Sequence, residues 1–348
     1  MDFLKVLPLL FLLAGCTMPR YLFKQSIGQL KIQTSGEANE KVLADPRISQ
    51  EHKDKIKIIV DAKNFFLKYF DHKDSGIYSK TIFLDEPAVS WLVIASKHDE
   101  IKAYEHSFPF MGSFPYLGFF SKKDAENFEQ GLRKEKLVTY IRPVYAYSTL
   151  GYFEDRILSS FFEYDEVELV ELVFHELFHT LFFVKDNVEF NENLASFMSD
   201  RLLEEYFKEN PKLSLYRKQQ NAHRRFDQQL VSIAKGVEVE FEKKRPTLTP
   251  TDAKKIVSTV VTELLIPVVK DFCSQQQLAA KDCPDKIEEW NQARLAALLT
   301  YQSSQNFLDK LIKDMDAKLF YSQLKVWQKE WSKDSSGKSF MEFLETKI

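Results

Sequence analysis

The sequence predicts an α+β protein that is mostly helical, with a small antiparallel sheet in the N-terminal half and helices through the C-terminal half. Between about residues 77 and 150, runs of β-branched and aromatic residues alternate with Gly and Pro, as in short strands joined by turns. From residue 165 onward, apolar residues instead recur at the spacing of helices. No later stretch resembles a domain linker, so we expect one domain over residues 16–348.

The N-terminal half of this domain should combine two helices with several strands. Residues 51–70 place apolar groups at helical spacing and predict an amphipathic helix. A second helix over 124–136 interrupts the strand-like region, and Asp124 is its expected N-cap because its carboxylate can accept from the first turn. The strand-like runs are 81–84, 90–96, 114–120 and 137–148.

The helical half begins with a recognisable start signal. Asp165 is a typical N-cap, and Glu166 and Glu168 in the next turn suit the positive end of a helix dipole. This helix should reach about residue 184, before KDN (185–187) breaks it. Further helices are expected at about 191–207, 213–240, 251–277, 285–315 and 317–332, with loops at 209–213 and 245–252.

The first residues have the pattern of an export signal. The apolar stretch of residues 7–15 is too short to cross a bilayer, which takes ~20 residues, and it predicts a signal peptide over residues 1–15. LAGC (13–16) resembles the processing site of bacterial lipoproteins, in which Cys16 becomes the lipidated first residue. Thr17 follows the Cys, and in this respect the sequence resembles lipoproteins that are sorted to the outer membrane. The resemblance implies a lipid-anchored protein on the periplasmic face of the bacterial envelope. The alternative is an ordinary signal peptide with an incidental Cys.

The net charge limits the classes of binding partner, and the cysteine content limits the possible disulfides. The formal net charge is −3, so the chain offers no electrostatic case for binding nucleic acid or an anionic membrane surface. Cys273 and Cys283 are the only cysteines after Cys16, and neither has a partner at metal-ligand spacing. In an exported protein they form either a disulfide or two free thiols, and the sequence leaves both open.

The segment HELFH (175–179) has the residue pattern of a metal site. On a helix, His175 and His179 lie on one face with Cβ atoms ~5–6 Å apart, close enough for two imidazoles to converge on one Zn²⁺ ion. Glu176 borders this position without occupying it, which suits a general base. Two incidental histidines on a buried helix are the alternative interpretation.

A third ligand would distinguish these interpretations, since catalytic zinc takes three protein ligands and keeps one position open. Glu192 lies thirteen residues after His179, at the start of the next predicted helix. Two antiparallel helices joined by a short turn would bring it beside the histidines. The alternative is a solvated carboxylate in the first turn.

HELFH followed by NENLA (191–195) is the motif of glutamate-zincins, and the short interval resembles the bacterial family of predicted zinc aminopeptidases. The chain departs from this family at Arg156, where Pro is usual, and at Gln292, which interrupts a double Asn. Residues 209–285 resemble it only loosely. The other similar segments are GQLKIQ (28–33), LADPRIS (43–49), FPFMGSFPYLGFF (108–120), AYSTLGYFEDRIL (146–158) and EEWNQARLAALLTY (288–301).

This resemblance implies a zincin-like metallopeptidase fold and hydrolysis of a peptide substrate, with Zn²⁺ held by His175, His179 and Glu192. Glu176 would take a proton from water and deliver it to the leaving amine. Tyr147 and Tyr152 are candidates for stabilising the oxyanion, although packing in the core explains them equally simply.

Several other residues have open assignments. Ser196 and Asp200 follow Glu192 by one and two helical turns and are candidates for orienting the imidazoles, or they face solvent. The acid that would anchor a substrate amine is not identified, since Glu154 and Asp155 fit an ordinary turn. We expect Arg294 and Tyr301 to have a packing role. Two functions compete with an aminopeptidase: an endopeptidase of the same chemistry, and a non-catalytic zinc-stabilised binding or chaperone-like lipoprotein.

Overall fold

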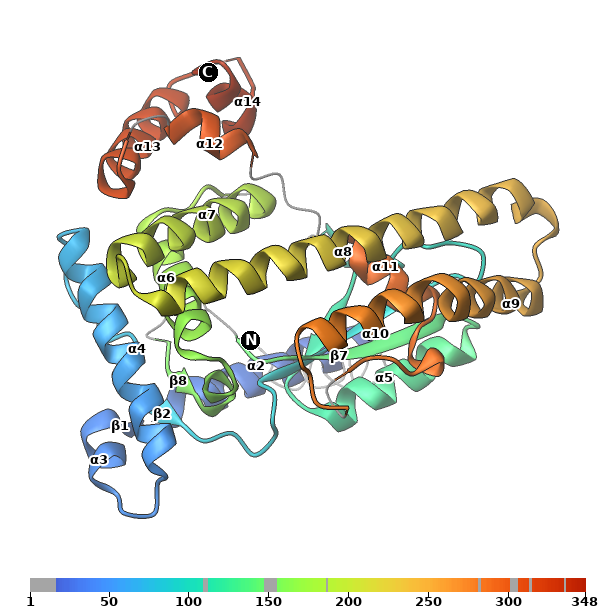
Figure 1. The fold of residues 1–348 in the computed structure, drawn as a ribbon, viewed down its shortest axis with the longest axis horizontal. Helices are drawn as coiled ribbons and strands as arrows, with labels where there is room; N and C mark the ends of the chain where they lie inside the picture. Colours follow the sequence, from blue (N-terminus) through green and yellow to red (C-terminus); the bar gives the residue numbers. More distant parts are fainter. Residues whose placement is uncertain are drawn as a thin grey trace, which may run out of the picture.

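The computed structural model describes residues 17–108, 112–146, 155–185, 187–280, 283–300, 306–312, 315–334 and 336–348. This part of the chain is mostly helical with small sheets, which confirms the α+β class (Figure 1). None of its helices is both long and apolar enough to cross a membrane. The predicted signal peptide and Cys16 lie outside the described residues.

Three helices form the start of the described chain: α2 (Thr17–Thr34), α3 (Asn39–Ala44) and α4 (Gln50–Tyr69). Helix α4 agrees with the predicted helix to within a residue at each end, and the Ser49 side chain caps it by accepting from the His52 amide. Its buried residues include Ile56, Ile59 and Phe66, at the spacing of one helix face. Helix α2 was not predicted, because its apolar residues do not gather on one buried face.

The single small antiparallel sheet that we predicted is wrong in its arrangement. In one three-stranded sheet, β3 (Ser90–Ser96) lies between β6 (Leu117–Phe119) and β7 (Val138–Val144), antiparallel to both. A second sheet has the order β1–β2–β8, and its β2–β8 pair is parallel, with Thr81 opposite Ile157. The strands outside the first sheet are β1 (Glu37–Ala38), β2 (Lys80–Ile82), β8 (Ile157–Leu158) and the β4–β5 hairpin (His106–Phe108 and Gly112–Phe114).

Two local predictions in this region also need correction. The run 114–120 does not form one strand; β5 ends and β6 begins around Pro115, whose ring removes a backbone donor. Helix α5 (Lys122–Lys134) has Ser121 rather than Asp124 at its N-cap. Asp124 instead lies in the first turn, where its carboxylate pairs with Lys24 at 2.5 Å.

The C-terminal half is helical as predicted, with different interruptions. The predicted helix 251–277 is divided by a π-helical turn (Val261–Leu265) directly before Pro267, which cannot donate the usual backbone hydrogen bond. The predicted helix 285–315 is wrong: the described part contains a 3₁₀ turn and two short helices. The elements here are η2 (Ser159–Glu163), α6 (Glu166–Leu181), α7 (Val188–Phe207), α8 (Pro211–Lys244), η3 (Arg245–Thr247), α9 (Pro250–Val260), α10 (Ile266–Gln275), η5 (Ile287–Glu289), α11 (Gln292–Thr300), α12 (Asn306–Ile312), α13 (Ala317–Trp331) and α14 (Phe340–Glu345).

The largest apolar cluster surrounds α6, which packs against α4 and α7. Phe174 and Phe178 of α6 are fully buried within it. A second cluster joins the later part of α8 to α9, α10 and α11, and a third lies between the β6–β3–β7 sheet and α5. The long helix α8 runs from beside α6 to this second group (Figure 1). Helix α6 is therefore fixed by the core over most of its surface.

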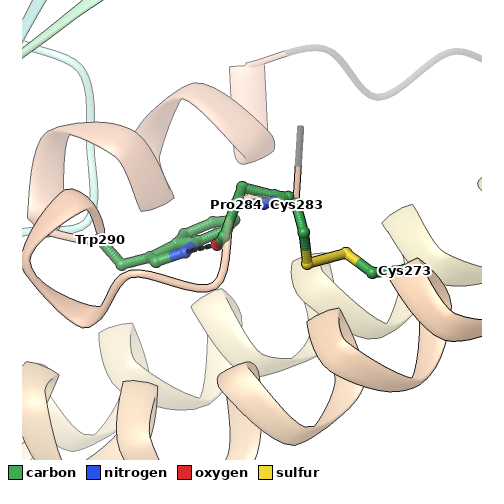
Figure 2. The surroundings of a disulfide bond; sticks show 4 residues. All are labelled: Cys273, Cys283, Pro284 and Trp290. Carbon is green, nitrogen blue, oxygen red and sulfur yellow. Dashed lines mark hydrogen bonds between the residues drawn. A yellow bond between two sulfur atoms is a disulfide. The ribbon is translucent and has the colours of Figure 1, made fainter. Parts of the chain in front are cut away.

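Of the two arrangements left open for Cys273 and Cys283, the structure contains the disulfide. Cys273 of α10 is bonded to Cys283, with Cα atoms 5.8 Å apart (Figure 2). After Cys283, the Trp290 indole donates to the Pro284 carbonyl at 2.8 Å. This hydrogen bond holds the segment between Pro284 and Trp290 (Figure 2). The disulfide lies at the second cluster and joins α10 to the loop before η5, so it is not part of α6 or α7.

Candidate metal site

The motif helix α6 starts where its sequence predicts. The Asp165 carboxylate accepts from the Glu168 amide at 2.9 Å, and the Glu168 carboxylate accepts from the Asp165 amide at 3.0 Å. This capping box satisfies two backbone donors at the helix start. Further along α6, the four-residue spacing of His175 and His179 places them one above the other on the same face.

The turn between α6 and α7 is held by one buried side chain. The Asn191 amide accepts from the Val184 backbone N–H at 2.8 Å and donates to the Val184 carbonyl at 2.7 Å. Both backbone groups of that residue are thereby satisfied in a site without water access, where unpaired groups are costly. Asn191 is next to Glu192, so this contact sets the position of the proposed third ligand. The sequence showed the Asn-Glu pair, but it gave no sign of this clamp.

Three donor atoms converge between the two helices. The Nε2 atoms of His175 and His179 are 3.1 Å apart, and the Glu192 carboxylate oxygens lie 3.3 Å from the first and 3.5 Å from the second. Ligands held at ~2.0–2.1 Å around a tetrahedral Zn²⁺ ion are about 3.3 Å from each other. The two imidazoles match this separation, and one ligand atom from each of the three residues lies within 4.8 Å of the other two, so the group is suited to hold one ion. This is the one group of such residues in the described chain whose donor atoms are this close.

The electrostatics of the three residues reflect their contact. Hydrogen bonds from both imidazoles lower the pKa of Glu192 to about 2. Burial opposes charging of His175, but its bond to Glu192 and the nearby charges of Glu176 and Glu171 outweigh this and raise its pKa. His179 is buried almost completely. The carboxylates around His175 therefore favour a positive charge between the two helices.

Ser196 is close to the ligand set, and Asp200 is not. The Ser196 hydroxyl lies 3.3 Å from Nδ1 of His175, as expected for a residue one turn after Glu192. A proton on Nδ1, donated to this hydroxyl, leaves the Nε2 lone pair free to bind a metal. Asp200 instead pairs with Arg217 of α8, so its predicted contact with an imidazole is wrong. Nδ1 of His179 has no hydrogen-bond partner among the described residues.

The half-buried Glu176 has an aromatic neighbour that the sequence did not reveal. Burial, followed by the charges of Glu176 and Asp155, raises the pKa of Tyr78, whose ring is fully buried. Tyr78 has a left-handed backbone, with φ of 55°, which is unusual for a residue with a bulky side chain. Its amide donates to the Asp155 carbonyl at 2.8 Å. Asp155 thus belongs to a buried structural contact next to the motif.

A second acidic residue of α6 lies one turn before His175. The Tyr216 hydroxyl of α8 donates to the Glu171 carboxylate, and the Gln220 amide donates to the Tyr216 oxygen at 2.8 Å. Burial raises the pKa of Glu171, and the Tyr216 bond partly opposes this. This chain of bonds joins the metal-site helix to α8. The spacing of Glu171 from His175 was visible in the sequence, but the partner on a distant helix was not.

The remaining predicted residues are placed as follows. Tyr147, Tyr152, Glu154 and Tyr301 lie outside the described residues. Arg294 stacks on the Trp290 ring, 4.0 Å from its centroid, and pairs with Glu289, which agrees with a packing role.

Taken as a class, the chain is an α+β protein with a two-histidine, one-glutamate group suited to a metal ion. Residues 20–336 match the family described as "Putative aminopeptidase", and the chain belongs to this family. No curated protein and no solved structure matches it.

Proposed function

We propose that this protein is a zinc-dependent peptidase with a zincin-like fold, acting as an aminopeptidase and anchored by a lipid on Cys16 to the periplasmic face of the outer membrane. The observation that carries the proposal is the convergence of His175, His179 and Glu192, with donor atoms 3.1–3.5 Å apart. Family membership supports peptide hydrolysis. The sequence at residues 1–16 supports the anchor.

The donor set fits zinc better than a hard cation. Two imidazoles and one carboxylate suit Zn²⁺, whereas Ca²⁺ and Mg²⁺ prefer six or more oxygen ligands. When bound by three protein ligands, zinc polarises a carbonyl group and lowers the pKa of water. The open fourth position favours a catalytic site over a structural one, which usually has four protein ligands.

The residues of the chain have distinct tasks in this mechanism. His175, His179 and Glu192 hold the ion, and Ser196 keeps the His175 ring in the required tautomer. Glu176 follows His175 by one position and stays outside the donor group. Its carboxylate takes a proton from the attacking water and passes it to the leaving amine.

The first experiment combines metal analysis with turnover. Glu176→Gln should keep one zinc ion per chain while kcat falls by ~10²–10⁴-fold, because a general base contributes about that factor. Glu192→Ala should lose zinc and activity together, whereas Glu205→Ala, near the exposed end of α7, should keep both. Zinc binding without any turnover in the unchanged protein would favour the alternative of a non-catalytic binding lipoprotein. Unchanged turnover in a zinc-loaded Glu176→Gln variant would show that Glu176 is not the general base.

The substrate class needs a separate measurement. We expect aminoacyl-coumarins with a free α-amine to be cleaved, and peptides with a blocked N-terminus to be resistant. Cleavage of blocked peptides alone would replace the aminopeptidase by an endopeptidase of the same chemistry.

A further inference from the structure

Helix α2 exposes a row of large apolar side chains. Their exposed fractions are 38% for Leu22, 67% for Phe23, 51% for Ile27 and 61% for Leu30. At ~100° per residue, these four side chains cover an arc of about 140° on the outer face of the helix. Within α2 the other residues in this arc are Pro19, Ser26, Gln33 and Thr34, so it contains no charge. We call Leu22, Phe23, Ile27 and Leu30 the α2 stripe.

The opposite face of α2 is docked on the protein, so the outward direction of the stripe is fixed. The Tyr21 hydroxyl donates to the Gly118 carbonyl at 3.1 Å, and Ile32 is buried in the main apolar cluster. At Gly28 the helix approaches the Phe120 ring so closely that an added Cβ would lie 2.2 Å from it. Any larger residue there would push the helix away from the sheet region.

The hydroxyl groups around the stripe already have partners. The Ser26 hydroxyl donates to the Leu22 carbonyl at 2.9 Å, so it does not need water. Thr34, just beyond the stripe, donates in the same way to the Leu30 carbonyl at 2.7 Å. At the border, Lys31 pairs with Asp85 at 2.8 Å. Transfer of this face to an apolar environment would therefore leave no hydroxyl unpaired.

The position of α2 in the chain indicates what covers the stripe. The helix begins at Thr17, directly after Cys16, the residue that carries the lipid in the proposed function. Phe23 follows Cys16 by seven positions, or ~10 Å along a helix. A lipid on Cys16 thus keeps the stripe within reach of the membrane surface. Within α2, Arg20, Lys24 and Lys31 are basic and no residue is acidic, but Lys24 pairs with Asp124 and Lys31 pairs with Asp85. We therefore expect apolar contact to supply most of the attraction.

We propose that the α2 stripe rests in the interfacial layer of the lipid bilayer, with α2 parallel to the membrane plane, as a second attachment beside the lipid. This proposal rests on the lipid anchor of the proposed function and is independent of the peptidase chemistry. Side chains of this size at the boundary between headgroups and acyl chains are the usual contact of interfacial helices. The second attachment restricts how the enzyme is oriented on the membrane.

The test removes the lipid so that the stripe acts alone. The chain from residue 16 carrying Cys16→Ser should bind vesicles of phosphatidylethanolamine and phosphatidylglycerol in a flotation assay. Adding Phe23→Ser, Ile27→Ser and Leu30→Ser should weaken binding by about tenfold or more. The matched control replaces three exposed apolar residues on other helices by Ser and should bind normally: Leu215, Val239 and Leu319.

A second measurement reports directly on the stripe. In the Cys16→Ser chain, a fluorophore on Leu30→Cys should shift to shorter wavelength when vesicles are added, and one on Leu319→Cys should not. Absent vesicle binding, or equal binding by the stripe and control variants, would overturn the proposal. Mass analysis of the lipid on Cys16 in the unmodified chain tests the anchor separately, so either attachment can fail without the other.

Discussion

Ser196→Ala should weaken zinc binding without unfolding the site. The Ser196 hydroxyl is 3.3 Å from Nδ1 of His175, at the long end of the hydrogen-bond range. Loss of a partner that orients a ligating histidine typically costs 10–100-fold in metal affinity. Because this bond is long, we expect the lower limit, about tenfold, or ~1.4 kcal/mol. Competition with a chromophoric zinc chelator at fixed pH measures this change.

The same helix supplies a matched control for this experiment. Ser199 is fully buried, and its hydroxyl donates to the Ser196 carbonyl at 2.9 Å without touching an imidazole. Ser199→Ala removes an equivalent hydroxyl three residues away, so zinc affinity should change by less than about twofold. If the two variants lose the same affinity, the hydroxyl of Ser196 does not act on His175 and the argument fails.

Three further changes test the turn, the disulfide and a buried acid. Asn191→Ala leaves both backbone groups of Val184 unpaired and should lower the free energy of unfolding by ~2–4 kcal/mol. The control Asn187→Ala breaks one exposed hydrogen bond and should lower it by under ~0.5 kcal/mol. Equal losses for the two variants in urea unfolding would refute this expectation. Replacing Cys273 and Cys283 by Ser should cost ~3 kcal/mol, because the loop spans ten positions, and leave zinc content unchanged; calorimetry and metal analysis measure both. Burial raises the folded pKa of Glu171 above its unfolded value of 4.5, so its stabilising contribution is present below that pH and lost as pH rises through the folded pKa. The Tm gain of Glu171→Gln in metal-free protein should therefore be larger at about pH 7.5 than at about pH 4, and the reverse order would contradict it.

The sequence predicted that His175 and His179 share one helix face, because their relation is local. A helix places residues four apart on one face whatever surrounds it, and Asp165 with Glu168 specifies where that helix begins. Glu192 was found through its spacing, since a short break between two helices returns the chain beside itself. The strand 90–96 was predicted at its observed ends because its β-branched and aromatic residues are bounded by turn residues on both sides.

The features that were missed depend on residues distant in the chain. The parallel pairing of β2 with β8 joins residues 81 and 157, and no local pattern records such a partner. Tyr216 reaches Glu171 from another helix, and the buried position of Tyr78 beside Glu176 comes from packing around η2 and α6. In each case tertiary context decides what the local sequence leaves open.

The two halves of the candidate metal site are held by different means: the histidines by the core around α6, and Glu192 by the start of α7. The histidines are on α6, whose faces are enclosed by the core, so changes there should first affect folding. Glu192 is on the first turns of α7, where its side chain is 52% exposed and its position depends on the Asn191 clamp. Changes at the contact between Val184 and Asn191, in the turn from α6 to α7, can thus move the carboxylate while the histidines stay in place. Metal affinity should consequently be adjusted mainly through this turn, and variants there should change zinc binding more than the unfolding of α6.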